Sequence, residues 1–377
     1  MPRMILTKQP MFIKRKVTTF VAGVCALSLA STSLLGCNRS QGSFSILATG
    51  QAFTQTKSDV TNQVDILWVV DNSFSMDPLQ QNLVQNFNTF INNFQTKGFD
   101  YKMAVITSDA FLANPAFRNQ PEMAKFRSGG VGGDTGYTYI TPSLPDPVAT
   151  FVSIATQGQF GSGDERAFSS IMTSLNSPLN DGFRRPGAFF AIIILSDEDD
   201  FSDATRPEGS WHQQGGVPDH SYTNPNLETV DSYVSQLDTL TSSTASKRNY
   251  NVSAITVTDQ TCRDQHGGQA PSSIIGTRYM DMVTKTGGVL GSICDASYAN
   301  SLEMIQKQII ELSTQFPLTR EPNPSTIMII VDGKVVPQDS INGWTYDAAS
   351  NTITFHGTAV PTSGAAINIQ FDPAQLL

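Results

Sequence analysis

Cysteine and histidine are scarce in this chain, and their scarcity narrows the chemistry that it can carry out. The 377 residues include four cysteines and four histidines, and no two cysteines are spaced as CxxC. A thioredoxin-type redox motif and a zinc knuckle are therefore not expected. The patterns HExxH, GxSxG, GxGxxG and the Walker motif are also missing. The commonest signatures of zinc proteases, serine hydrolases and nucleotide-binding proteins are thus absent from the sequence.

Basic residues are also few, with 24 Lys and Arg against 33 Asp and Glu. Five of the basic residues and none of the acidic ones lie in residues 1–36, so the remainder has 19 basic side chains and a net charge of −14. An acidic protein of this kind is a poor partner for nucleic acid or for anionic lipid surfaces. The charge suits a protein that holds cations.

Residues 1–36 have the pattern of a secretory signal, with a basic start followed by the apolar run "VTTFVAGVCALSLASTSLLG". The sequence Leu34-Leu35-Gly36-Cys37 resembles the bacterial lipobox, in which the cysteine is acylated and becomes the new N-terminus. We therefore expect a lipoprotein anchored in the cell envelope through Cys37. Asn38 after the cysteine, by resemblance to enterobacterial sorting, favours the outer membrane. An ordinary signal peptide with a chance cysteine is the alternative.

Residues 37–61 are polar and rich in Gly, Ser and Thr, which predicts a flexible tether behind the anchor. Cys25 lies in the signal, so Cys262 and Cys294 are the two cysteines left in the body of the chain. In an exported protein they most simply form one disulfide, and two reduced buried thiols are the alternative.

Between residues 62 and 317, apolar strands alternate with amphipathic helices. The runs "VDILWVV" and "GAFFAIIIL" are continuous enough to be strands covered on both faces, and apolar residues recur at helical spacing between Met76 and Phe94. Regular alternation predicts an α/β domain with a doubly wound, mostly parallel sheet flanked by helices. Residues 318–377 instead contain short alternating strands around an Asp332-Gly333 turn, which predicts a small all-β domain.

The first of these strands ends in Asp71, followed by Ser73 and Ser75, and the strand "GAFFAIIIL" ends in Ser196-Asp197. In a doubly wound sheet, ligands bind at the carboxyl ends of central strands, so these side chains are expected to share one crevice. A carboxylate with two hydroxyls lacks the His or Lys base that nucleophilic catalysis needs. It is a good partial shell for Mg²⁺, Mn²⁺ or Ca²⁺, with Mg²⁺ preferred.

Asp71-x-Ser73-x-Ser75 together with Ser196-Asp197 resembles the metal-ion-dependent adhesion site (MIDAS) of von Willebrand factor A-type (vWA) domains. The resemblance implies that Asp71, Ser73 and Ser75 ligate the metal directly and that Asp197 acts through water. A threonine from a middle loop usually completes the site, but the loop here reads "GQFGSGDERAF". Ser162 is the expected substitute, and Asp164 and Glu165 are the secondary candidates for the metal. "GSGDE" and "LSDEDD" resemble the bacterial exported members of the family, in which Glu165 recurs without an assigned role.

The acidic run "DEDDFSD" at 197–203 fails the EF-hand pattern because Phe201 stands where an oxygen is needed. It is expected to be a solvated acidic loop.

The resulting hypothesis is a lipid-anchored envelope protein, not an enzyme, whose vWA domain binds a divalent cation and, through it, a protein ligand that presents a carboxylate. Two alternatives stay open at this point. One is a structural envelope scaffold in which the metal only stabilises the fold, and the other is a metal-dependent hydrolase with Asp71 and Asp197 as ligands.

Overall fold

The computed structural model describes residues 53–57, 62–203, 222, 224–245, 247–266 and 274–374. All of these residues belong to one compact unit within residues 50–377. The predicted signal, the lipidation site Cys37 and the start of the predicted tether lie outside the described residues.

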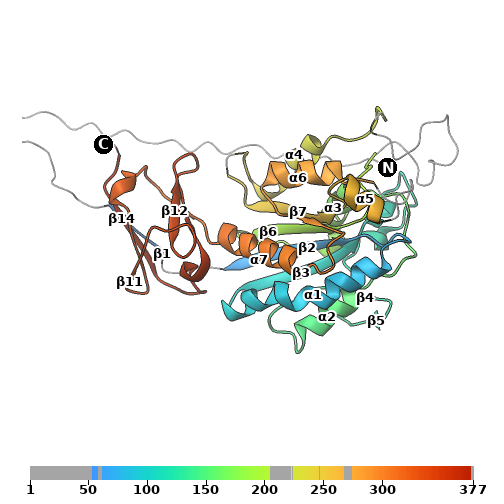
Figure 1. Ribbon diagram of the computed structural model, residues 1–377, viewed down its shortest axis with the longest axis horizontal. Coiled ribbons are helices and arrows are strands. Elements are labelled where there is room, and N and C mark those ends of the chain that lie inside the picture. Colours follow the sequence, from blue (N-terminus) through green and yellow to red (C-terminus); the bar gives the residue numbers. More distant parts are fainter. Residues whose placement is uncertain are drawn as a thin grey trace, which may run out of the picture. The chain divides into compact units, whose positions relative to one another are not determined.

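Five parallel strands form the central sheet, in the order β3-β2-β6-β7-β8 (Figure 1). They are β2 (Gln63–Val70), β3 (Asp100–Thr107), β6 (Phe189–Leu195), β7 (Tyr250–Thr256) and β8 (Leu290–Ser292). The chain leaves β2 for β3 on one side, whereas β6 leads to β7 on the other, so the strand order reverses between β2 and β6. The register pairs Val70 with Leu195 and with Thr107, and the three strands therefore end at one level.

Helices cover both faces of this sheet. The helices are α1 (Asp77–Thr96), α2 (Pro147–Ala155), α3 (Ala167–Leu175), α4 (Val230–Thr241), α5 (Gln260–Gln265), α6 (Thr277–Thr286) and α7 (Ala299–Ser313). Buried residues of α1, α2 and α7 share one apolar cluster, and those of α3, α4 and α6 share a second. The predicted doubly wound α/β class is confirmed.

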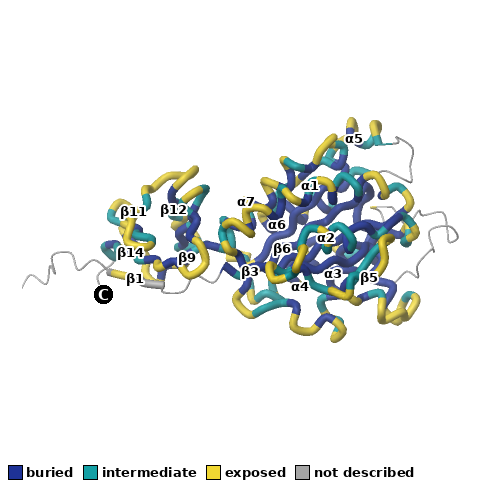
Figure 2. Tube along the Cα trace, turned by 90° about the horizontal axis from the view of Figure 1, so that it is seen from below, coloured by how far each residue is buried: buried dark blue, intermediate teal, exposed yellow. Residues whose placement is uncertain are grey.

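Strand β2 shows why the sheet is buried on both sides. Ile66, Trp68 and Val70 belong to the first cluster, whereas Leu67 and Val69 belong to the second. Successive strand side chains point to opposite faces, so a continuous apolar run supplies both cores. Figure 2 shows the strands as a buried layer between more exposed helices.

Short polar residues start several of the helices. Asp146 accepts a hydrogen bond from the backbone of Ala149 at the start of α2, Thr229 from Ser232 at α4, and Asp259 from Cys262 at α5. Each cap satisfies a backbone N–H that the helix itself leaves unpaired. None of the helices in the described ranges combines the length and apolar character that crossing a membrane requires.

The C-terminal residues form most of two small antiparallel sheets, β1-β14-β10-β11, in which β1 (Phe53–Lys57) comes from far earlier in the chain, and β12-β13-β9. Their strands are β9 (Phe316–Pro317), β10 (Met328–Val331), β11 (Lys334–Val336), β12 (Trp344–Asp347), β13 (Thr352–Phe355) and β14 (Ile367–Phe371). Asp332 and Gly333, which join β10 to β11, both have positive φ, of 48° and 78°. This is the two-residue hairpin turn that an Asp-Gly pair favours, and the predicted small β region is confirmed.

One part of the predicted tether is instead a strand. Residues 53–57 form β1 (Phe53–Lys57), which pairs antiparallel with β14 and places Phe53 opposite Phe371. The interpretation of 37–61 as a flexible tether was wrong for these five residues. Their partner lies about 310 residues later in the chain, and nothing in a short Thr-rich segment reveals such a distant pairing.

The two body cysteines form the expected disulfide. Cys262 on α5 and Cys294 after β8 are bonded, with their Cα atoms 5.6 Å apart. The bond ties α5, at the carboxyl end of β7, to the segment that follows the edge strand β8. The alternative of two reduced thiols is thereby excluded in this structure.

Candidate metal centre

Asp71 and Asp197 lie side by side at the point where the strand order reverses. Asp71 follows β2 and Asp197 comes two residues after the end of β6, and the backbone N–H of Asp71 donates to Leu195 O at 3.0 Å. Crevices at such reversals are where doubly wound sheets bind ligands. The structure therefore brings together the two carboxylates that the sequence placed there.

The Asp71 carboxylate is buried and held by three donors. Oδ1 accepts hydrogen bonds from the backbone N–H of Ser73 at 2.8 Å and from Ser108 Oγ at 3.4 Å, and Oδ2 accepts one from Ser196 Oγ at 2.7 Å. Burial and the neighbouring Asp197 raise the pKa of Asp71 to about 6. Ser196 was expected at this crevice without a role as a ligand, whereas Ser108 was not predicted, although it too follows a strand of the sheet.

Ser73 and Ser75 occupy the turn that leads into α1. Ser73 is buried, and its Oγ makes no hydrogen bond of normal geometry to a described residue, although it lies close enough to Asp71 to lower the pKa of that carboxyl a little. Ser75 is half-buried. Burying a hydroxyl without a hydrogen-bond partner costs free energy. A cation bound by the Ser73 oxygen would offset this cost. Ser73 thus fits the role that the vWA resemblance implied for it.

Asp197 is fully buried and contacts a histidine that sequence reasoning missed. His266 Nε2 lies 3.0 Å from Asp197 Oδ2, while Oδ1 has no hydrogen-bond partner among the described residues. The hydrogen bond to Asp197 raises the pKa of His266, against the opposing effect of burial. His266 follows α5 directly, so the disulfide at Cys262 helps to position it.

The middle loop places its three candidate residues in different surroundings. Ser162 is half-buried, and its Oγ accepts from the backbone N–H of Asp164 at 3.1 Å. Asp164 uses both carboxylate oxygens on Arg166, at 2.9 Å to Nε and 2.7 Å to Nη2. Asp164 is therefore a partner of Arg166 and is not available as a ligand while that pair persists.

Glu165 differs from both of its neighbours. It is completely buried, and neither of its carboxylate oxygens makes a hydrogen bond of normal geometry to a described residue, although the Ser108 hydroxyl lies close enough to lower its pKa a little. Burial, followed by the charges of Asp71 and Glu198, raises the pKa of Glu165 well above its usual value. Glu165 is thus the residue of this loop that best fits the ligand position left open by the missing threonine, ahead of Ser162 and Asp164.

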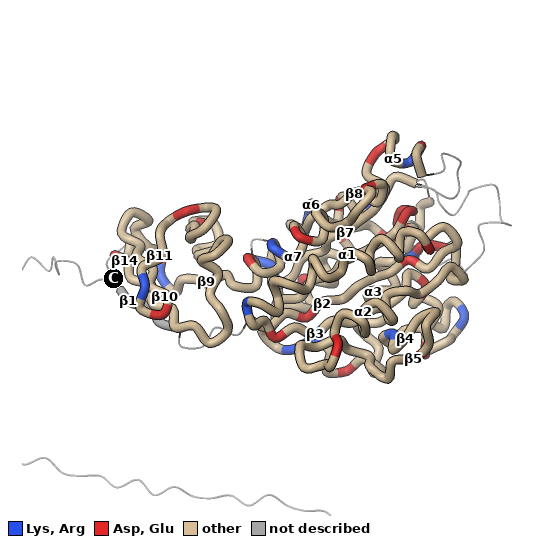
Figure 3. Tube along the Cα trace, turned by 60° about the horizontal axis from the view of Figure 1, so that its bottom comes forward, with Lys and Arg blue, Asp and Glu red and all other residues tan. Residues whose placement is uncertain are grey.

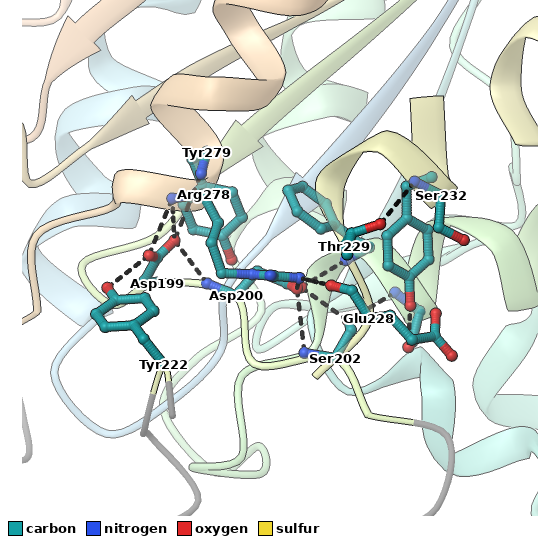
Figure 4. Close-up of polar contacts among 12 residues, drawn as sticks. Asp199, Asp200, Ser202, Tyr222, Glu228, Thr229, Ser232, Arg278 and Tyr279 are labelled. Atoms are coloured by element: carbon teal, nitrogen blue, oxygen red, sulfur yellow. Dashed lines mark hydrogen bonds and ion pairs between the residues drawn. The ribbon is translucent and has the colours of Figure 1, made fainter. Parts of the chain in front are cut away.

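The acidic run 197–203 was wrongly predicted to be solvated. All four of its aspartates and Glu198 are buried. In Figure 3 several acidic segments gather at the end of the sheet near α5. Asp199 accepts hydrogen bonds from Tyr222 and from the backbone of Arg278 at the start of α6, as Figure 4 shows, and also from the Thr277 hydroxyl.

Asp200 makes an equally structural set of contacts. Its Oδ2 accepts from the backbone N–H of Phe168 at the start of α3 at 2.9 Å, and its Oδ1 lies 3.1 Å from Arg278 Nη2 (Figure 4). Asp199 and Asp200 therefore satisfy two helix N-termini, where a negative charge is favoured. They are not spare cation ligands, which leaves Asp197 and Glu198 as the members of the run nearest to the site.

The donor set fits a hard divalent cation. Four buried oxygens lack a hydrogen bond of normal geometry from the described residues: Ser73 Oγ, both oxygens of Glu165, and Asp197 Oδ1. Oxygen is the ligand that Mg²⁺, Mn²⁺ and Ca²⁺ prefer. Within the described ranges, no three His, Cys, Asp or Glu side chains already surround a common metal position. Ligation thus needs the serine hydroxyls and an adjustment of the carboxylate side chains.

Cation binding should depend on pH. Burial raises the pKa of Glu198 to about 9, with Asp71 and Asp197 adding to the rise, and Asp71 itself is raised to about 6. A raised pKa means that metal-free stability falls as pH increases from about 4 to about 9, because the folded state resists ionisation. A cation favours the ionised carboxylates, so its binding should release protons and tighten with pH.

We expect Mg²⁺ titrations followed by thermal unfolding to give a lower apparent Kd at about pH 8 than at about pH 5. Calorimetry in buffers of different ionisation enthalpy should show proton release. Equal affinity at the two pH values would contradict ionisation of these carboxyls on binding.

Gln80 on α1 joins the two loops that form the site. Its Nε2 donates to Asp71 O at 2.7 Å and to Gly158 O at 2.9 Å, and its Oε1 accepts from Gly158 N at 2.9 Å. Gln80→Ala should lower the free energy of unfolding by about 1–3 kcal/mol, since it leaves buried backbone groups unpaired. Urea unfolding would measure this, with the exposed Gln85→Ala on the same helix as a control expected to stay within about 0.5 kcal/mol. A cost equal to that of the control would show that the side chain does not hold the loops.

Comparison with known proteins gives a distant likeness in structure alone. No protein family and no curated protein matches the chain. A pilus adhesin, SpaC from Lactobacillus rhamnosus GG, is 12% identical with a TM-score of 0.38, and the match covers 82% of this chain and 38% of the adhesin. Proximal thread matrix protein 1 from the mussel byssus is 14% identical with a TM-score of 0.35, covering 71% of this chain and 51% of that protein.

A further structure of the mussel protein, with a zinc-occupied MIDAS motif, is 13% identical with a TM-score of 0.34. The chain thus spans only 38% to 51% of the length of the structures that it matches. At these scores the likeness carries no conclusion about function, and the α/β fold class rests on the sheet and helices of this chain itself.

Proposed function

We propose that this protein is a non-enzymatic, lipid-anchored binding protein of the bacterial cell envelope, and that its vWA-like domain holds a divalent cation. Asp71, Ser73, Ser75, Glu165 and Asp197 would hold the ion, at the carboxyl ends of β2 and β6. The observation that carries the proposal is the group of buried oxygens there that lack a hydrogen bond of normal geometry from the described residues. The cation would supply an electrophilic centre that accepts a carboxylate from a protein ligand.

The anchor follows from the sequence around Cys37, and the outer membrane is the proposed location. Mg²⁺ is the proposed ion, with Mn²⁺ and Ca²⁺ as the other hard cations to test.

A structural envelope scaffold is the second candidate, and one observation favours it. Asp71, Glu165, Asp197 and Glu198 are buried close enough for each charge to influence its neighbours' pKa values. Four ionised carboxylates would more than neutralise a divalent cation, leaving it a weaker acceptor for a partner's carboxylate. In that case the ion would stabilise the fold without taking part in adhesion.

A metal-dependent hydrolase is the remaining candidate. It would need a general base beside the cation, and His266 is the histidine of the described ranges that contacts Asp197. Because His266 Nε2 is engaged by Asp197, we propose that it orients this carboxylate and does not act as a base.

Thermal unfolding of the chain from residue 38 onward, with and without millimolar Mg²⁺, Mn²⁺ or Ca²⁺, tests the cation site. An ion at a hundredfold its Kd should stabilise the fold by about 2.7 kcal/mol. The stabilisation should disappear in Asp71→Ala, because this change removes the central carboxylate. If none of the three ions raises the melting temperature, the metal site is rejected. If an ion stabilises the fold but no protein binds in a metal-dependent way, the scaffold is favoured.

A further inference from the structure

Two phenylalanines at the candidate metal centre are unusually exposed. Phe160 is 90% exposed and Phe74 is 80% exposed, and the next most exposed large apolar side chains of the described residues, Val131, Val335 and Ile341, are at 66%. Single exposed apolar residues are common on protein surfaces and need no explanation. Here, however, the two most exposed ones flank the same site, which is the feature to be explained.

The loops that carry these two residues are bound to each other. The backbone N–H of Gly161, next to Phe160, donates to Asn72 O at 2.8 Å, two residues before Phe74. A Cβ on Gly161 would lie 2.3–2.4 Å from the Asn72 side chain, so the loops touch with no room for a larger residue. Gln80 adds its hydrogen bonds to Asp71 O and Gly158. The two rings are therefore held on neighbouring, fixed segments.

The same two segments supply ligands of the candidate cation. Phe74 lies between Ser73 and Ser75, and Phe160 precedes the segment that leads to Glu165. The two rings therefore stand on the segments that a protein group reaching the cation would meet. Aromatic side chains beside a central polar contact are typical of the residues that contribute most to protein interfaces.

We propose that Phe74 and Phe160 form an apolar rim around the cation, and that the partner is a protein segment whose carboxylate is flanked by apolar side chains. The inference rests on the proposed function and specifies its ligand. A cation held by buried oxygens is complementary to the carboxylate, and the rings are complementary to its apolar neighbours. The rim also excludes water from the metal–carboxylate contact, which strengthens it.

A phage-displayed library of random peptides, selected on the immobilised chain in Mg²⁺ and eluted with EDTA, tests the proposal. We expect the eluted peptides to be enriched in Asp or Glu with Leu, Ile, Phe or Trp within two positions. No enrichment in EDTA eluates, or acidic peptides without apolar neighbours, would overturn the proposal.

The double variant Phe74→Ser/Phe160→Ser then tests the rim directly. It should bind the selected peptide about tenfold or more weakly, because the contacts to two rings are lost. The matched control is Val335→Ser/Ile341→Ser, which removes two exposed apolar side chains from the C-terminal β region and should bind as the unaltered chain does. Equal loss in both double variants, or no loss in either, would overturn the proposal.

Stabilisation by Mg²⁺ separates this inference from the proposed function. Both double variants should keep the full Mg²⁺-dependent rise in melting temperature, since neither changes a ligand oxygen. If the unaltered chain shows no such rise, the cation site itself fails. If the rise is present but no acidic peptide is recovered, the cation site stands and the rim proposal is overturned.

Discussion

Arg166→Ala is expected to destabilise the protein by about 3–5 kcal/mol. The Arg166 guanidinium makes two hydrogen bonds to Asp164 and one to the backbone carbonyl of Asp203, and both charged side chains are 1–2% exposed. It also lies over the rings of Phe111 and Phe117, 5.0 and 4.7 Å from their centroids. Truncation would leave the Asp164 carboxylate buried without its charge partner, which is the costly way to break a buried pair.

Chemical unfolding of Arg166→Ala beside Arg263→Ala would measure the effect. Arg263 is 39% exposed and pairs with the exposed Asp264, so its loss should cost less than about 1 kcal/mol. The double change Arg166→Met/Asp164→Leu should cost less than the sum of its single changes, since it leaves no lone buried charge. If Arg166→Ala and Arg263→Ala lower the free energy of unfolding by the same amount, the buried pair has no structural role.

This pair illustrates what the sequence could and could not reveal. The strands β2 and β6 were predicted because burial on both faces of a sheet produces an apolar run that is visible locally. The middle loop offered Ser162, Asp164 and Glu165 at adjacent positions, and nothing local distinguishes them. Their roles depend on Arg166 and on the distant Asp71 and Glu198, which only the folded chain brings near.

The acidic run failed for a similar reason. Asp and Glu are usually exposed, so a run of them reads as a solvated loop. Asp199 and Asp200 are buried because the starts of α3 and α6 and the side chain of Arg278 provide their partners. Those partners lie about 30 to 80 residues away in the sequence. His266 was missed because its link to Asp197 is equally remote.

Glu165→Gln should remove most of the stabilisation that a divalent cation gives, which is about 2.7 kcal/mol at a hundredfold the Kd. Glutamine keeps the shape of the side chain but lacks the charge that a hard cation needs. Without metal, the variant should be at least as stable as the unaltered chain above about pH 5. The reason is that burial raises the pKa of Glu165, so the folded protein must take up a proton there, and glutamine need not.

Ser162→Ala is the matched comparison, because Ser162 is the other candidate for the place of the missing threonine. It should keep the metal-dependent rise in melting temperature, since the Ser162 hydroxyl already accepts from the backbone of Asp164. The reverse result, with the rise lost in Ser162→Ala and kept in Glu165→Gln, would mean that a hydroxyl completes the site. The ion would then face only the two carboxylates of Asp71 and Asp197, whereas ligation by Glu165 adds a third negative charge, which weakens the attraction for a partner's carboxylate and shifts more of the partner affinity to Phe74 and Phe160.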